Sequence, residues 1–305
     1  MSDSLVFSRD MTFEYGEPHE ISGLVRRIVA NNPSPFTFTG TGTYVVGRGT
    51  VAVIDPGPVD DAHYQALIRA LDGETVSHIL VTHTHRDHSP LAARLAAATG
   101  ARTHAYGPHG SGRQAAVAID EALSLDAGGD RDFAPDVAVG HGDVIEGPGW
   151  TLEAVFTPGH TSNHLSFALR EENALFSGDH VMAWSTSVVA PPDGHMGDYM
   201  ASLDAVLARG EEVYWPTHGP AVTRPQRFVT KLAQHRRARE AMILARLRAG
   251  DRTIAEMVPR IYGGLDPRLV PAASLSTLAH VVDLIEREAV ETDGPVSMTG
   301  TFRAR

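Results

Sequence analysis

Four short motifs, each rich in histidine or aspartate, constrain this chain more than any other feature. They supply seven side chains of the types that bind metals, namely His83, His85, Asp87, His88, His160, Asp179 and His218. Each motif also carries small or turn-forming residues, as expected where a strand hands over to a loop. Five imidazoles and two carboxylates suit two borderline divalent ions about 3.5–4 Å apart. The set therefore predicts metal-assisted hydrolysis.

The spacing within the first motif indicates how its side chains divide. His83 and His85 lie two residues apart, so on a strand end their side chains can point the same way. Asp87 continues this alternation, while the adjacent His88 can turn toward a second ion. A lone histidine in such a place is usually an ordinary surface residue. Four separate motifs in this order favour a joint site instead.

Two of the later candidates follow turn signals. Pro158 and Gly159 precede His160 and predict a sharp turn that brings the backbone close to a metal. Asp179 follows a short apolar run and Gly178. A carboxylate shared by two cations offsets their mutual repulsion, and Asp179 is the natural candidate for that bridge.

These motifs resemble those of the metallo-β-lactamase superfamily, within it the glyoxalase II-like branch and most closely the β-lactamase-like protein 2 group. The resemblance rests on the HxHxDH run at residues 83–88 and on stretches at 51–57, 157–164, 176–180 and 214–220. It implies an αββα sandwich with the metals at one edge, followed by a winged-helix domain. It also implies that His83, His85 and His160 hold one ion, that Asp87, His88 and His218 hold the other, and that Asp179 bridges them.

The expected cofactors are two divalent metal ions, with zinc preferred and manganese or iron as alternatives. The chain has no cysteine, so nitrogen and oxygen must supply all protein ligands. Hydrolysis would use a hydroxide bridging the ions, because such ions lower the pKa of water from ~16 to ~7. Asp87 is the catalytic candidate, placed to orient this hydroxide or to take its proton.

Four further residues are assigned supporting roles. His195 and Tyr199, between the last two ligand motifs, are candidates for substrate contact, against the alternative of a solvated loop histidine and a packed tyrosine. Asp55 is predicted to hold a ligand loop by hydrogen bonding and not to bind metal itself. His164 is predicted to hydrogen-bond the loop of the nearby His160.

The charge of the chain changes just after the last ligand motif. Residues 1–223 carry 12 Arg and 28 Asp plus Glu, a net charge of −16, whereas residues 224–270 carry 11 Lys plus Arg and 4 Asp plus Glu, a net charge of +7. Such a shift predicts a domain boundary near residue 223. We therefore expect a catalytic domain over residues 1–223 and a helical linker with a winged-helix domain over 224–305. Interleaved strands and helices place the chain in the α/β (α+β) class.

The C-terminal part is predicted to contain a helix over 225–249, a short helix at 253–258, a helix over 272–287 and a β-hairpin. This is the order of a winged helix-turn-helix. Arginines on the first helix, among them Arg236, Arg237 and Arg239, could contact RNA phosphates as a basic stripe. The preferred alternative is that this domain packs on the sandwich, shapes the pocket or mediates a homodimer.

Three functions remain at this point. The chain could hydrolyse a small ester, thioester or lactone, cleave single-stranded RNA as an endoribonuclease, or bind nucleic acid without hydrolysing it. The first is preferred because the catalytic segment is strongly acidic and would repel a phosphate backbone. With no long apolar run and an acidic start to the chain, we expect a cytoplasmic protein that binds no membrane.

Overall fold

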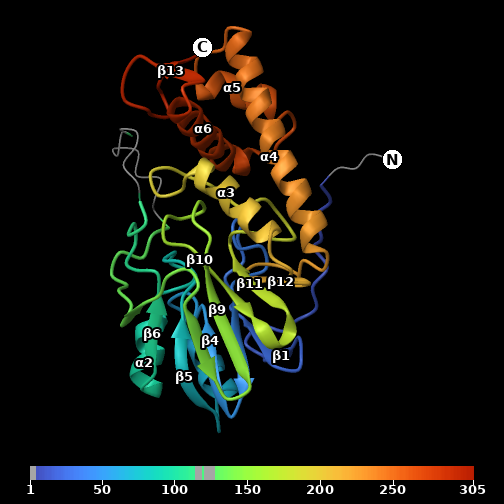
Figure 1. Ribbon diagram of the computed structural model, residues 1–305, viewed down its shortest axis with the longest axis vertical. Coiled ribbons are helices and arrows are strands. Elements are labelled where there is room, and N and C mark those ends of the chain that lie inside the picture. The colour runs from blue at the N-terminus through green and yellow to red at the C-terminus, as the bar shows by residue number, and fades with distance from the viewer. Residues whose placement is uncertain (1–4, 114–118, 120–127) are drawn as a thin grey trace.

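Two β-sheets pack face to face, with helices on their outer faces and a helical region beyond one end (Figure 1). The computed structural model describes residues 5–113, 119 and 128–305. The first sheet has the strand order β1-β2-β3-β4-β5-β6-β7. Its strands are β1 (His19–Glu20), β2 (Val25–Val29), β3 (Gly42–Arg48), β4 (Thr50–Ile54), β5 (Thr75–Leu80), β6 (Arg102–Ala105) and β7 (Val137–Ala138).

The second sheet has the order β12-β11-β10-β9-β8. Its strands are β8 (Val144–Gly147), β9 (Trp150–Phe156), β10 (Leu165–Leu169), β11 (Ala174–Gly178) and β12 (Val213–Pro216). Helices α1 (Asp61–Ala70) and α2 (Ala92–Thr99) contribute to the core outside the first sheet, and α3 (Met196–Leu207) to the core outside the second. This is the predicted αββα sandwich.

Alternating side chains along each strand build these layers. In β3, Tyr44 belongs to the core between the sheets, whereas the next residue, Val45, packs in the core that contains α1 and α2. The Tyr44 hydroxyl donates to the Pro216 carbonyl at 2.6 Å, and the Trp150 indole donates to the Thr50 carbonyl at 2.9 Å. Each large ring thus fills the central core while its polar atom bonds the opposite sheet.

Most predicted elements appear with small shifts at their ends. The Asp60 carboxylate caps α1 by accepting from the Ala62 amide at 2.8 Å. Helix α2 begins at Ala92, two residues after Pro90. The largest omission is α3, because residues 196–207 were not predicted to form a helix.

The C-terminal region contains three helices and a strand pair in the predicted order. They are α4 (Pro225–Arg248), α5 (Ile254–Ile261), α6 (Val270–Glu286), β13 (Val290–Thr292) and β14 (Phe302–Ala304). A capping box at Thr253 and Glu256 starts α5. The stretch Pro267–Glu286 is apolar and long enough to cross a membrane, but 56% of its most apolar window is buried inside the protein. Burial of this extent is typical of a core helix.

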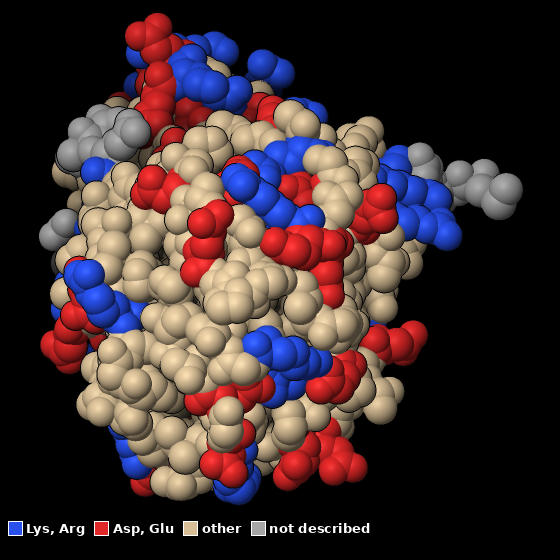
Figure 2. All heavy atoms as spheres, turned by 60° about the horizontal axis from the view of Figure 1, so that its bottom comes forward, with Lys and Arg blue, Asp and Glu red and all other residues tan. Residues whose placement is uncertain are grey.

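The arginines of α4 do not form the predicted exposed stripe. Arg236 is only 3% exposed and donates to the Ser187 carbonyl, and Arg239 is half-buried and donates to the Ile261 carbonyl at 2.8 Å. Arg237 is exposed and pairs with Asp204. Figure 2, which brings the end away from the helical region forward, shows basic and acidic side chains interspersed on that face of the sandwich. Packing against the sandwich, for Arg236, and against α5, for Arg239, has thus removed two of the three proposed RNA contacts from the exposed surface.

His195 links the sandwich to α6. It lies at the N-cap of α3, with Nδ1 3.2 Å from an Asp198 carboxylate oxygen and Nε2 2.7 Å from Glu286 on α6. The hydrogen bond to Asp198 and the charge of Glu286 raise the pKa of His195 to about 9, although burial opposes this shift. The imidazolium therefore joins two carboxylates from different helices at neutral pH.

We expect this link to make stability depend on pH. Because the pKa of His195 is higher in the folded state than its unfolded value of about 6.5, the stabilisation is complete below pH 6.5 and is lost as pH rises through 9. The free energy of unfolding, measured by chemical denaturation, should change less between pH 6.5 and pH 9.5 in His195→Asn than in wild type. Asparagine is a good N-cap residue without a titratable ring. Equal pH dependence in the two proteins would contradict this assignment.

Candidate metal centre

The four ligand motifs meet because each follows the end of a strand. The run 83–88 comes after β5, His160 after β9, Asp179 directly after β11 and His218 after β12. Their side chains form three groups whose potential donor atoms lie within 4.8 Å of one another. These groups are His83, His85 and His160; His83, His88 and Asp179; and Asp87, His88 and His218. All seven predicted ligands therefore converge, two groups sharing His83 and two sharing His88.

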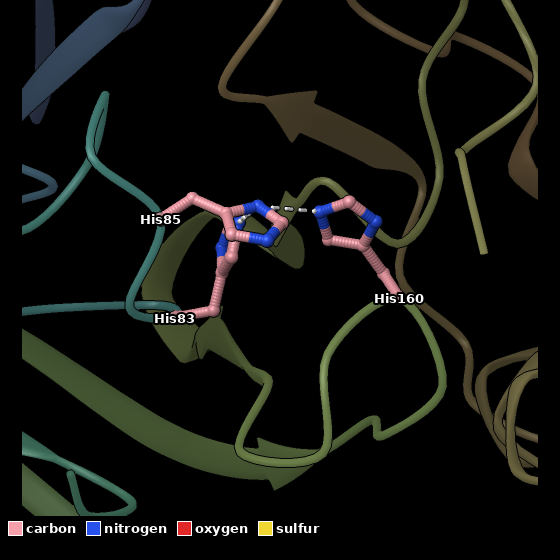
Figure 3. A group of neighbouring side chains, drawn as sticks. All are labelled: His83, His85 and His160. Atoms are coloured by element: carbon pink, nitrogen blue, oxygen red, sulfur yellow. Dashed lines mark hydrogen bonds between the residues drawn. The ribbon is translucent and has the colours of Figure 1, made fainter. Parts of the chain in front are cut away.

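The three imidazole rings of the first group converge on a common point (Figure 3). His83 Nε2 and His160 Nε2 lie 2.9 and 3.1 Å from His85 Nδ1. The Val188 carbonyl can only accept, so its 2.5 Å contact fixes the proton of His160 on Nδ1. Nε2 of His160 then carries a free lone pair. Crowded lone pairs of this kind fit a cation.

The third group, Asp87, His88 and His218, combines a carboxylate with two imidazoles. Asp87 Oδ2 lies 3.1 Å from His218 Nε2 and 3.4 Å from His88 Nε2. His218 Nδ1 donates to the Gly40 carbonyl at 3.1 Å, which turns Nε2 toward the site. The His88 Nε2 atom is buried without a hydrogen-bond partner among the described residues. A buried ring nitrogen that has no hydrogen-bond partner and lies beside a carboxylate is the arrangement expected of a metal ligand.

Asp179, the carboxylate of the group with His83 and His88, lies between the other two groups. Its Oδ2 is 3.7 Å from both His160 Nε2 and His88 Nε2, and its Oδ1 is 3.4 Å from His218 Nε2. Within the described part of the chain, the buried Oδ1 atom has no hydrogen-bond partner. This position fits the bridge proposed from the sequence.

The two halves of the site differ in charge. Burial, followed by the neighbouring His160, lowers the pKa of His85 to about 3, so this imidazole is neutral. Burial also acts on His218, but Asp179 and Asp87 outweigh it and raise the pKa of His218 to about 10. Two carboxylates that stabilise a protonated His218 this strongly would be equally well placed to compensate a divalent cation.

Asp55 fixes the loops that carry the ligands. Its carboxylate accepts from the Thr82 amide and hydroxyl, both at 2.8 Å, from His88 Nδ1 at 2.9 Å and from the Thr217 hydroxyl at 3.0 Å. Thr82 and Thr217 each precede a ligand histidine. One buried carboxylate thus orients His88 directly and ties the first and last ligand motifs together, as predicted.

Glycine is required beside two of the ligands. Gly159 has φ +131°, and a Cβ at this position would lie 2.3 Å from the backbone of Tyr199. Gly178 has φ +52°, and a Cβ there would lie 2.5 Å from the ring of His164. The turns before His160 and Asp179 therefore close only without a side chain.

The predicted substrate contacts are not found at the metal centre. His195 points to Asp198 and Glu286, as described above, and Tyr199 is fully buried with its hydroxyl donating to the His180 carbonyl at 2.9 Å. The alternative of a packed tyrosine therefore holds for Tyr199, while His195 caps a helix that the sequence does not predict. The prediction for His164 is confirmed, since its ring contacts the Thr157 hydroxyl at 2.8 Å and accepts from the Asp179 amide at 3.1 Å.

A cavity of about 550 Å³ opens above the metal ligands. His85, Asp87, His160, Asp179 and His218 form its polar floor. Much of the remaining wall is apolar, with contributions from Phe36, Met182, Val188, Ala190 and Leu275. The sequence analysis did not identify these wall residues. Leu275 belongs to α6, and only the folded chain shows that this helix reaches the site.

Comparisons with known proteins agree with this geometry. A family model described as the metallo-beta-lactamase superfamily matches residues 37–218, and one described as a beta-lactamase associated winged helix domain matches residues 253–296. A metallo-beta-lactamase family protein from Thermus thermophilus is 25% identical, with a TM-score of 0.74 over 94% of this chain and 100% of that chain.

Named relatives of similar length cover nearly the whole chain. The lactamase-like protein adaB of Aspergillus niger is 30% identical over 94% of this chain and 88% of its own length. A beta-lactamase-like protein 2 homolog of Caenorhabditis elegans is 30% identical over 90% and 88%, respectively. An atrochrysone carboxyl ACP thioesterase of Claviceps purpurea is 28% identical over 86% and 79%. The chain belongs to the metallo-beta-lactamase superfamily and is a hydrolase of that fold with a winged-helix domain.

Proposed function

We propose that this enzyme hydrolyses a small ester, thioester or lactone with an apolar acyl group, using two divalent metal ions, preferably zinc. The observation that carries the proposal is the combination of a polar floor of ligands with an apolar wall in one cavity. Such a cavity holds the apolar part of a substrate while the floor engages the scissile carbonyl. The thioesterase among the relatives supports the thioester class.

The residues on the floor divide the work. His83, His85 and His160 would hold one ion, Asp87, His88 and His218 the other, with Asp179 shared. Two such ions, when bound, lower the pKa of a coordinated water and polarise a substrate carbonyl. Asp87 is the more exposed of the two ligand carboxylates, at 25% for its side chain against 9% for Asp179, and it lines the cavity. It is therefore placed to touch the attacking water.

The charge state of Asp87 indicates its role. Burial raises the pKa of this carboxyl, but His88 and His218 outweigh burial and hold the pKa well below its usual range. A carboxylate with so low a pKa is a weak base. We therefore assign Asp87 the task of accepting a hydrogen bond from the attacking water and orienting it, rather than storing its proton.

Cleavage of RNA is the weaker alternative. Two of the three arginines proposed to contact RNA, Arg236 and Arg239, are buried or half-buried, so they form no exposed stripe along which a nucleic-acid strand could lie. The third, Arg237, is already paired with Asp204. An apolar wall beside the metal floor also offers little to a sugar-phosphate backbone, which is bound through charged and hydrogen-bonding groups.

A panel of substrates tests the proposal. Zinc-loaded protein should hydrolyse acyl thioesters, p-nitrophenyl esters or lactones, with kcat/KM increasing with acyl chain length, and should leave single-stranded RNA intact. Asp179→Ala should lose nearly all of this activity, because the two cations would lack their shared carboxylate. Metal-dependent RNA cleavage that is abolished by Asp179→Ala, without turnover of any acyl substrate, would overturn the proposal.

Metal content tests the shared carboxylate. Protein purified without chelator and reconstituted with zinc should contain two ions per chain by elemental analysis, because His83, His85 and His160 would hold one ion and Asp87, His88 and His218 the other, with Asp179 shared. Asp179→Ala should lose at least one of them. A wild-type content of one ion that reconstitution does not change would contradict a shared carboxylate.

The variant Asp55→Asn tests the role of the buried carboxylate that ties the ligand loops together. The amide offers one acceptor oxygen and an NH₂ group that must face donors, so it cannot serve the four hydrogen bonds of the carboxylate. We expect zinc affinity to fall about 10–100-fold, measured by competition with a chelator. Asp72→Asn, at an exposed position, should behave as wild type. Unchanged zinc affinity in Asp55→Asn would show that the ligand loops hold their positions without it.

A further inference from the structure

A second hollow, of about 270 Å³, adjoins the metal cavity. Phe36 and Val188 line both spaces, and Leu275 in the wall of the cavity is followed by Ser276 in the wall of the hollow. We name this space the arginine hollow, because Arg236 and Arg239 of α4 line it together with His235 and Tyr262. It lies where the helical region meets the sandwich.

The two arginines face the hollow without a carboxylate partner. Within residues 5–113, 119 and 128–305, neither Arg236 nor Arg239 forms an ion pair with Asp or Glu, and no described residue lining the hollow is acidic. Arg236 is only 3% exposed, and the Nε atoms of both arginines are buried without an acceptor among the described residues. Buried guanidinium groups are normally paired, because an uncompensated charge is costly to desolvate.

The positive charge of the two arginines also lowers the pKa of the neighbouring histidines. Burial, then Arg239 and Arg236, lower the pKa of His235 to about 4. Burial, then Arg236, lower the pKa of His280 to about 3, and both ring nitrogens of His280 lack a partner among the described residues. Both imidazoles are thus neutral, which leaves the two arginines as the cations that face the hollow.

The hollow is also tied to the metal centre through the backbone. The Ser187 carbonyl accepts from Arg236, while the Ser187 hydroxyl donates to the Asp179 carbonyl at 2.5 Å. The next carbonyl, that of Val188, accepts from His160 Nδ1. Ser187 and Val188 therefore contact Arg236 as well as the predicted ligands Asp179 and His160. A substrate that spans the hollow and the metal cavity would pass along these two residues.

We propose that the arginine hollow binds an anionic group, a carboxylate or a phosphate, at the far end of the substrate whose acyl bond lies over the metal floor. This inference rests on the proposed acyl hydrolysis and assigns to it a substrate with a negatively charged end. Arg239 supplies specificity for that end, and Arg236 both contributes charge and anchors α4 on Ser187. A neutral substrate of equal length gains nothing from the hollow.

The kinetic test uses pairs of N-acetylcysteamine thioesters. Each pair has one acyl chain length, ending either in a carboxylate or in a methyl group, and several lengths are compared on zinc-loaded protein. At the best length, Arg239→Gln should raise KM for the carboxylate substrate about tenfold with little change in kcat, because it removes binding common to ground and transition states. KM for the methyl substrate should stay unchanged, and Arg239→Lys should restore part of the loss.

Arg237→Gln is the matched control, since this exposed arginine on the same helix pairs with Asp204 outside the hollow. It should behave as wild type on both substrates. If the carboxylate substrates show no advantage in wild type at any length, or if Arg237→Gln and Arg239→Gln have equal effects, the substrate assignment is wrong.

Titration with sulfate tests the hollow independently of turnover. Zinc-loaded wild type and Arg237→Gln should bind sulfate with the same affinity by calorimetry, and Arg239→Gln about tenfold more weakly. A protein that hydrolyses no thioester, ester or lactone of the substrate panel but shows this pattern would refute the proposed acyl hydrolysis and keep the anion site. Sulfate binding that depends on Arg239, together with turnover that is indifferent to the carboxylate, would assign the hollow to a free anion instead. Equal sulfate affinities in all three proteins would refute the anion site.

Discussion

The structure is organised around the cost of burying histidines and carboxylates together at one edge of a sandwich. Four strands end at this edge and deliver seven metal-binding side chains, five of which lie at or below 9% exposure. Hydrogen bonds to carbonyls and to Asp55 fix several of the rings with Nε2 facing inward. Carboxylates gathered in a largely buried site require positive charge to compensate them, which metal cations can supply. Tight turns at Gly159 and Gly178, and the hydrogen-bonded loops beside them, follow from this requirement.

The sequence predicted the ligands well because their chemistry is local. An HxHxDH run after a strand is a specific indication of a metal site. The later motifs can be recognised in the sequence without knowing where each strand ends. The supporting role of Asp55 could be predicted for a related reason, since it ends a strand beside the ligand loops. Its hydrogen bond to Thr217, 162 residues away, could not.

The remaining features depend on packing between distant segments. Helix α3 was missed, and as a result His195 and Tyr199 were assigned to substrate contact. The first instead joins α3 to α6, and the second packs beneath the site. Arg236 looked like part of an exposed basic stripe, yet its helix turns that face to the sandwich. Nothing in the local sequence around Phe36 or Leu275 indicates that these residues form the wall of a cavity over the metals. The helical region therefore does more than follow the catalytic sandwich, since it completes the space in which a substrate would lie.

The central claim is that Asp179 is shared by two cations held by nitrogen and oxygen alone. X-ray absorption spectroscopy of the zinc-loaded protein tests it most directly, because it reports both the ligand shell and the distance between metals. The account predicts nitrogen and oxygen neighbours at about 2.0–2.2 Å and a zinc–zinc scattering path at about 3.5–4 Å. A spectrum of fully loaded protein without any metal–metal scattering would contradict the shared carboxylate and with it the dinuclear site.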